Sequence, residues 1–299
     1  MTKSEVAQLR EDFVRERTKL LNRRVSASEQ KLFDVIFKKV IEQFELDGGN
    51  IKASSANMDI ANRLHSIWKE FQKGDYMKVI GMFAGDMTEI QSLNKIYFSI
   101  LENDKAKIAK IGEGVDASIN KRLGLNKEGK VIKNGFLDKL IKDESFLKDI
   151  KKQTYKAVTG GESLKQFTKR MSTVITGNKS VNGGLVRHFN TFAYDTYAAV
   201  DRTAQKLWAG KLGLKAFIYA GGKIKTSRLF CIKNNGKVFT TDEAKDWEDL
   251  IGEYDGPMWA EGTYEPLRDM GGHRCRHSPN FISNREAISR RPELASVLS

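Results

Sequence analysis

Apolar residues recur at steps of three and four along most of the chain up to residue 212, and this spacing constrains the fold more than any other feature. It is clearest in residues 20–44 and 185–212, where it places the apolar side chains on one face of an α-helix. From residue 214 the pattern changes to short β-like runs at 216–220 and 237–240, with Gly and Asn turn signals. The sequence therefore predicts a mainly α-helical protein with a small C-terminal α+β module.

Changes in composition divide the chain into four predicted regions. These are an N-terminal helical region (1–111), a Gly/Lys-rich linker or arm (112–136), a second helical part (137–213), and a small α+β module with Cys, His and a tail (214–299). The linker is expected to be a hinge, because several glycines interrupt a lysine-rich stretch there.

Individual residues predict where helices begin and end. Ser54 and Ser163 are expected to cap helix N-termini, and Thr240 precedes acidic residues that suit a first helical turn. Gly74 and Gly161 are expected to stop helices, because glycine adopts the backbone conformation that ends a helix at little cost.

Bulk properties suit a chain with a real core and much charged surface. Of the 299 residues, 40% are hydrophobic and 30% are charged. No apolar run reaches the length of roughly 18 residues that a membrane span needs, so no span is expected. The N-terminus lacks the apolar core of a signal peptide, which predicts synthesis in the cytoplasm. Two cysteines do not make a secreted disulfide framework.

The net charge of +13 is unevenly distributed. Residues 101–180 contain 18 basic and 10 acidic groups, whereas residues 222–299 contain 12 of each. A basic excess suits contact with nucleic acid or with an acidic protein, and a solvated lysine-rich surface explains it equally well. The candidate nucleic-acid contacts are Lys130, Lys133, Arg274 and Arg276.

Arginines near the C-terminus have two interpretations. Arginine favours bidentate partners such as carboxylates and phosphates. An acidic stretch predicted to be helical, Asp242–Asp255, supplies carboxylates for an internal salt-bridge network with Arg228, Arg274 and Arg276. Contact of these arginines with phosphate is the alternative.

Both cysteines and two of the four histidines fall between residues 231 and 277. Cys231, His273, Cys275 and His277 are side chains that zinc favours, and a tetrahedral site takes four ligands. Alternate residues of an extended strand share a face, so His273, Cys275 and His277 could point the same way. Three ligands on one short strand would strain a tetrahedral centre, so two of them together with Cys231 are expected to bind a metal, with one left over. Three interpretations stay open: a structural zinc site, a Cys231–Cys275 disulfide or thiol pair, or side chains that only pack and hydrogen-bond a turn.

The order of short motifs from 137 to 282 resembles the minor head proteins of tailed bacteriophages, the phage Mu protein F-like or head-morphogenesis family. The motifs are a Gly-x-Ser turn (161–163), a long Ala- and aromatic-rich helix (190–212), Thr-x-Arg-x-x-Cys (226–231), Gly-x-x-Phe (236–239) and His-x-Cys-Arg-His (273–277). The chain departs from the family at Lys225, where an Asp is common, and at His277, where a second Cys is usual.

This resemblance implies a structural, non-enzymatic component of the virion, made in the host cytoplasm and located in the capsid interior or at the portal vertex. Its expected partners are the portal protein or the major capsid protein, and double-stranded DNA packaged in the head. The expected cofactor is zinc or none. The alternative is a free-standing nucleic-acid-binding protein that acts through its basic 101–180 region.

Catalytic motifs are missing from the sequence. Residues 222–299 contain no Glu-x-Glu or Gln-x-Glu pair of the kind that ADP-ribosyltransferase chemistry requires. No His follows His277 to complete a His-Asn-His nuclease, and no Gly-x-Ser-x-Gly elbow is present. The sequence therefore predicts no catalytic residues.

Overall fold

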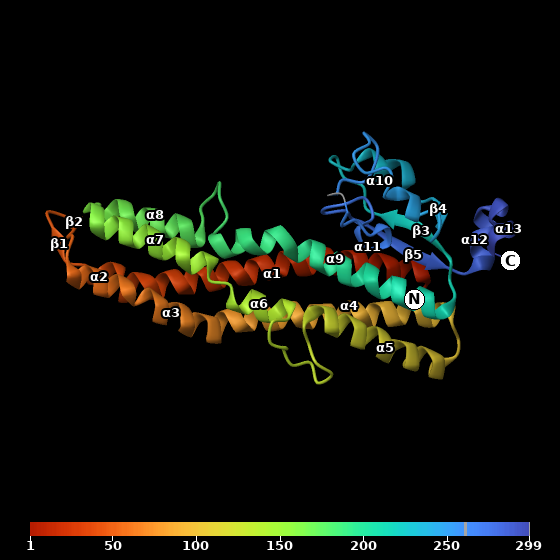
Figure 1. Cartoon of the computed structure of the whole chain (residues 1–299), viewed down its shortest axis with the longest axis horizontal. Coiled ribbons are helices and arrows are strands. Elements are labelled where there is room, and N and C mark those ends of the chain that lie inside the picture. Colours follow the sequence, from red (N-terminus) through yellow and green to blue (C-terminus); the bar gives the residue numbers. More distant parts are fainter. Residues whose placement is uncertain (260–261, 299) are drawn as a thin grey trace. The chain divides into compact units, whose positions relative to one another are not determined.

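A computed structural model of the chain describes residues 1–259 and 262–298, so Ala260, Glu261 and Ser299 of the predicted α+β module lie outside the described residues. The protein is mainly α-helical with a small antiparallel sheet near its C-terminus, as the sequence predicted (Figure 1). In the part of the chain that the structure describes, no helix combines the length and the apolar character that crossing a bilayer requires.

Helices dominate the chain as far as residue 212. They are α1 (Lys3–Lys39), the 3₁₀ helix η1 (Ile41–Gln43), α2 (Ser55–Asn62), α3 (Leu64–Phe71), the π-helical turn η2 (Gln72–Tyr76), α4 (Met77–Leu101), α5 (Lys105–Leu123), α6 (Phe136–Lys142), α7 (Ser145–Gly160), α8 (Leu164–Thr176) and α9 (Gly184–Leu212). Between η1 and α2, the short strands β1 (Leu46–Asp47) and β2 (Asn50–Ile51) form a hairpin.

Three strands and several short helices follow. They are β3 (Ala216–Gly221), α10 (Leu229–Asn234), β4 (Val238–Thr240), η3 (Lys245–Trp247), α11 (Pro266–Asp269), β5 (His277–Ile282), α12 (Asn284–Arg290), η4 (Pro292–Leu294) and α13 (Ala295–Leu298).

The chain forms two compact units that do not follow the order of the sequence. Unit 1 contains Met1–Arg17, Gly85–Lys130 and Ala193–Ser299, and unit 2 contains Thr18–Ala84 and Val131–Phe192. Helices α1, α4 and α9 each contribute residues to both units, so the four regions predicted from composition do not correspond to these units.

In unit 2, α7 packs against α2, α3 and α8. Ser54 caps α2 as predicted, and its side chain accepts a hydrogen bond from the backbone of Asn57. The buried Asn57 amide also donates to the carbonyls of Glu45 and Lys52, which fixes the ends of the β1–β2 hairpin. Aromatic rings fill the centre of this unit, namely Trp68, Phe71, Tyr76, Phe146 and Phe189.

Two local predictions were wrong, and a third was confirmed in position only. Gly74 does not end a helix, because the backbone continues through the π-helical turn η2 directly into α4. Residues 112–123 are not linker, because they form the second half of α5; Val115 and Ile119 are buried there, and the helix ends only at Gly124 in a left-handed conformation. Ser163 is the N-cap residue of α8 as predicted, although its side chain makes no capping hydrogen bond.

The sheet of unit 1 has the order β4-β3-β5, and all neighbouring strands are antiparallel. Side chains alternate between its faces, so Ala216 and Ile218 lie on one face with Val238 and Ile282. This face is covered by the C-terminal helices, whose Ala287, Leu294 and Leu298 belong to the same apolar cluster.

The other face of β3 presents Phe217 and Tyr219. Both rings pack against Trp247, which also contacts Phe230 and Phe239. Trp247 comes from η3, where a longer helix was predicted. Thr240 and Glu243 do exchange backbone-to-side-chain hydrogen bonds, as in a capping box, but only a 3₁₀ turn follows.

A buried polar network joins α1, α4, α9 and β5 within unit 1. The Arg10 guanidinium donates to Asn94 Oδ1 at 2.6 Å and to Asn280 Oδ1 at 2.5 Å, and it lies 4.6 Å from the centre of the Tyr97 ring. Asp201 accepts a hydrogen bond from Asn94 and is 3.8 Å from Arg10. Because both charges are buried, each depends on the other for compensation.

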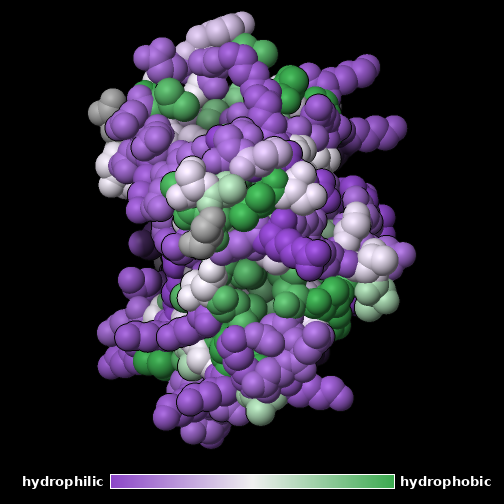
Figure 2. Space-filling model, turned by 90° about the vertical axis from the view of Figure 1, so that its right-hand side faces the viewer, coloured by the Kyte–Doolittle hydropathy of each residue, from purple (hydrophilic) through white to green (hydrophobic). Residues whose placement is uncertain are grey.

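The surface is mostly hydrophilic on the face shown in Figure 2, with apolar residues gathered around a hollow near its middle. Such a gathering of apolar residues on a charged surface is a common property of ligand and partner sites.

Candidate metal centre

Three segments of unit 1 bring the Cys and His side chains together. Cys231 lies in α10, Cys275 lies in the turn before β5, and His277 is the first residue of β5. The central strand β3 contributes Tyr219 beside them. All of these side chains are buried, and Cys231, Cys275 and His277 are only 3%, 2% and 1% exposed.

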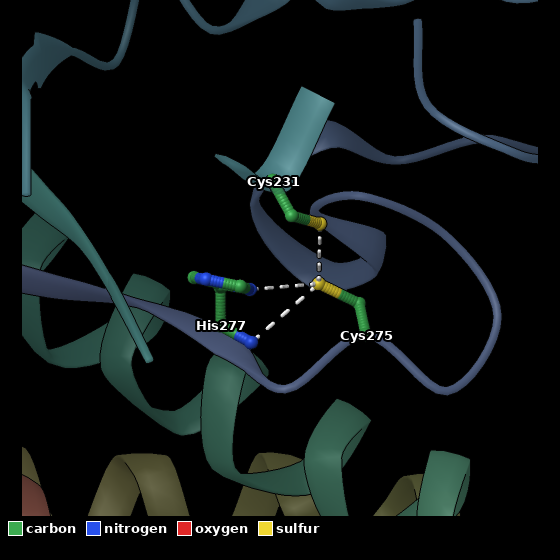
Figure 3. Close-up of side chains that lie close together, drawn as sticks. All are labelled: Cys231, Cys275 and His277. Atoms are coloured by element: carbon green, nitrogen blue, oxygen red, sulfur yellow. Dashed lines mark hydrogen bonds between the residues drawn. The ribbon is translucent and has the colours of Figure 1, made fainter. Parts of the chain in front are cut away.

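The three donor atoms form a tight triangle (Figure 3). The Sγ atoms of Cys231 and Cys275 lie 3.7 Å apart, and Cys275 Sγ lies 3.7 Å from His277 Nδ1. One donor atom from each of the three residues lies within 4.8 Å of the others. Both cysteines are free thiols, so the structure shows a close thiol pair without a disulfide bond.

This spacing matches the edges of a tetrahedral metal site. Zinc–sulfur bonds of about 2.3 Å at the tetrahedral angle place two sulfurs about 3.8 Å apart. The observed 3.7 Å between Cys231 and Cys275 has this length. The donors therefore fit a soft or borderline ion without rearrangement of the two thiols.

Neighbouring groups pack closely against the thiols and His277. The Tyr219 ring stacks on the His277 imidazole at 4.8 Å between centroids, and the Tyr219 hydroxyl lies 3.3 Å from Cys231 Sγ. A Cβ at Gly271 would lie 2.3 Å from Cys231 Sγ and 3.3 Å from Cys275 Sγ. Glycine is required at this position because any side chain would collide with the sulfur.

Charge around Cys275 favours its thiolate. Burial raises the pKa of Cys275, but hydrogen bonds from Cys231 and His277 and the positive charge of Arg202 outweigh it and hold that pKa well below its ordinary value. The hydrogen bond to Cys275, followed by burial, raises the pKa of Cys231. Arg202 itself donates to the Cys275 carbonyl at 2.5 Å. The thiolate is the form of cysteine that binds metal.

Comparison with known protein families, with characterised proteins and with solved structures finds no match for this chain. The chemistry of the cluster therefore follows from its own donors. Two sulfurs and one imidazole nitrogen suit zinc and other ions that favour soft ligands. Their burial keeps bulk solvent and large substrates away from the donors.

His273 is the residue that does not join this cluster; the sequence predicted that Cys231 would be joined by two of the three, without specifying which one would be left out. Its side chain is exposed and stacks on Trp259 at 4.0 Å between ring centroids. The prediction assumed an extended strand from 273 to 277, but Arg274 has a left-handed backbone with φ of 55° and β5 begins only at His277. The turn therefore directs His273 away from the two sulfurs.

The predicted contacts with phosphate or carboxylate lie at several different places. Lys130 and Lys133 are exposed in the segment between α5 and α6, Arg274 is exposed, and Arg276 is half-buried. Arg228 donates to the His273 carbonyl at 2.6 Å and so stabilises the turn before β5. The acidic residues 242–255 form turns and one short 3₁₀ helix instead of the predicted acidic helix.

Sequence reasoning missed Tyr219, Gly271 and Arg202 as parts of the site. Gly271 belongs to a Gly-Gly pair, which signals a turn but not a close approach to sulfur. Tyr219 and Arg202 lie on β3 and α9, and only the folded chain brings them to the thiols.

Proposed function

We propose that this chain is a structural minor head protein of a tailed bacteriophage, which associates with the portal or the inner capsid. What supports this is the order of its motifs between residues 137 and 282, which resembles the head-morphogenesis family. The observation that carries a structural role is the buried Cys231–Cys275–His277 cluster. It connects α10 with the start of β5, and its burial suits a role in stability better than a role in catalysis.

The ion that suits this cluster best is zinc. Cys231 Sγ, Cys275 Sγ and His277 Nδ1 would supply three of its ligands, and the ion would add cross-links where the module has only a small sheet. Small domains commonly gain stability in this way, because metal binding and folding are coupled.

Metal analysis of the purified protein tests the zinc proposal. We expect about one zinc per chain and a lower melting temperature after chelation. Cys231→Ser and Cys275→Ser should both lose the zinc, whereas Ser227→Ala, on the same segment but outside the cluster, should keep it. A metal-free protein whose melting temperature does not respond to zinc or chelator would contradict the proposal.

Particle composition tests the virion assignment. The protein should co-purify with portal protein in mature particles, at a few copies per particle. Attachment through apolar helix faces should persist at raised salt, because salt screens charges but strengthens apolar contacts. Absence of the protein from purified particles would overturn the assignment.

The basic 101–180 region gives the second candidate, a nucleic-acid-binding protein. Its excess of 18 basic over 10 acidic groups favours contact with phosphates. Affinity for double-stranded DNA should then fall with salt at a slope of roughly 0.9 per phosphate contact, and Lys130→Gln with Lys133→Gln should reduce that slope. A slope near zero would remove this candidate.

A further inference from the structure

Unit 1 contains a cavity of about 450 Å³ at the C-terminal end of α9, apart from the Cys/His cluster. Small-ligand sites typically have volumes of roughly 300–1,000 Å³. Gly213 ends the helix in a left-handed conformation, with φ of 70°, and the chain then continues through Leu214 and Lys215, which line the cavity. α11 and β5 supply the rest of its apolar wall.

The inner part of the cavity is apolar. Ala209, Leu267 and Phe281 line it, and they are 1%, 8% and 1% exposed. Phe281 is held in place because its carbonyl accepts a hydrogen bond from the buried Tyr97 hydroxyl at 2.7 Å. A preformed apolar wall of this kind suits a hydrocarbon chain or ring.

The charged lining residues are three lysines and one glutamate. They are Lys206, Lys215, Lys245 and Glu265. Glu265 is already compensated, because Lys206 donates to it at 2.7 Å and Arg268 lies 3.1 Å from it. Lys245 is also paired, because it donates to Asp242 Oδ1 at 2.6 Å. Lys215 therefore supplies the excess positive charge beside the apolar wall.

We infer that this cavity binds a small amphipathic carboxylate, with its apolar part against Leu267 and Phe281 and its anionic group near Lys215. The positive charge of Lys215 favours an anion over a cation or a neutral molecule of the same shape. Lys215 is exposed and begins the segment that leads into β3, so its ammonium group is accessible at the rim.

Gly210 provides a way to fill the cavity without disturbing the fold. It lies in α9 and lines the cavity, and a Cβ added there would meet no heavy atom within 4 Å. Leucine at this position would occupy the open space, and it also favours the helix more than glycine does. Gly114 in α5 has the same open surroundings but does not line the cavity, so it serves as the matched control.

The test uses decanoate below its micelle concentration, with binding followed by calorimetry and by NMR shifts. We expect saturable binding of one decanoate per chain. Gly210→Leu should weaken it at least tenfold without lowering the melting temperature of the free protein, and Gly114→Leu should leave it unchanged. Lys215→Gln should weaken decanoate about threefold or more and have no effect on decanol.

Each other outcome overturns the inference. If decanoate does not bind at millimolar concentration, the cavity is not a site for this class of ligand. If Gly210→Leu leaves the affinity unchanged, the ligand binds elsewhere. If decanol or decylammonium binds as tightly as decanoate, Lys215 does not select an anion. None of these results depends on the virion assignment or on zinc.

Discussion

The sulfur atoms of Cys231 and Cys275 lie 3.7 Å apart, although the two residues are 44 positions apart in the sequence. The intervening chain contains β4 and α11, so the thiols meet only when this whole segment has folded. The contact therefore fixes α10 against the turn before β5. A metal bound there would stabilise the fold of the segment as well as the pair itself.

The two histidines near Cys275 should respond differently to substitution. His277→Ala removes a buried donor and leaves a gap beside Tyr219, so zinc content should fall and the melting temperature should drop. His273→Ala changes an exposed side chain, so zinc should stay bound and stability should change by about 0.5 kcal/mol or less. Thermal denaturation combined with metal analysis separates the two variants.

His277→Cys serves as the rescue, because a thiolate can replace an imidazole as a zinc ligand. It should regain zinc that His277→Ala lacks. Loss of zinc in His273→Ala with retention in His277→Ala would show that the wrong histidine has been assigned.

Gly271→Ala should disrupt the same site by a steric effect alone. The added Cβ would lie 2.3 Å from Cys231 Sγ and 3.0 Å from the Tyr219 hydroxyl, closer than atoms can approach. We expect a loss of roughly 1–3 kcal/mol in the free energy of unfolding, with weaker zinc binding. Urea unfolding measures the loss, and Gly114→Ala is the control.

Gly114 is a suitable control because it lies within α5, where an added Cβ would meet no heavy atom within 4 Å. Alanine there should raise the free energy of unfolding by up to about 1 kcal/mol, since it favours the helix more than glycine does. Equal stability of the Gly271→Ala protein and the unsubstituted protein would mean that the sulfurs can move aside. The packing around the thiols would then be looser than the distances indicate.

Much of the helical part could be predicted because its signals are local. The period of apolar residues places α9 within one residue of its observed start, and Ser54 caps α2 as expected. Gly74 was predicted to end a helix, and Gly112 and Gly114 were predicted to lie in a linker. The chain stays helical at all three, because neighbouring side chains are buried or the backbone hydrogen bonds continue. A helix tolerates glycine at a cost of about 1 kcal/mol, which tertiary packing can exceed.

The site could be predicted only in part because it depends on turns and long-range contacts. Composition identified Cys231, Cys275 and His277, since these residue types are few in the chain. It could not separate His277 from His273, because the left-handed backbone at Arg274 decides which imidazole reaches the sulfurs. Residue spacing carries no information on such a turn.

The buried pair Arg10 and Asp201 should be strongly coupled. Arg10→Met would leave the Asp201 carboxylate buried without its cation, and the expected loss is about 3–5 kcal/mol in the free energy of unfolding. Asp201→Leu should lower the free energy of unfolding by a similar amount, because it would leave the Arg10 guanidinium buried without its anion. The double variant should lose clearly less than the sum, because neither charge is then buried alone.

A double-mutant cycle by urea unfolding measures this coupling. Lys3→Met with Glu286→Leu is the comparison, since that pair also joins α1 to the C-terminal part of unit 1 but is partly exposed. Its coupling should be about 1 kcal/mol or less. Additive losses for Arg10 and Asp201 would show that the network of Asn94 and Asn280 compensates each charge independently.

Glu29 should make the stability of unit 2 depend on pH. Its buried Oε1 accepts hydrogen bonds from the backbone N–H groups of Leu185 at 2.6 Å and Val186 at 3.0 Å, at the start of α9. Burial raises the pKa of Glu29 to about 7, although these hydrogen bonds and the charge of Arg187 oppose the rise. The folded protein therefore holds this proton more tightly than the unfolded chain does.

The stabilising contribution of Glu29 is accordingly complete below its ordinary pKa of 4.5 and is lost as the pH rises through about 7. Glu29→Gln carries no charge at any pH. Its free energy of unfolding, taken relative to that of the unsubstituted protein, should therefore rise by on the order of 2 kcal/mol from pH 5 to pH 8. Urea unfolding of both proteins at these two pH values measures this rise. All other titratable groups are the same in the two proteins, so the difference between them reports on Glu29 alone. A difference that stays constant with pH would mean that Glu29 is already ionised at pH 5, with the N-terminus of α9 compensating its charge fully.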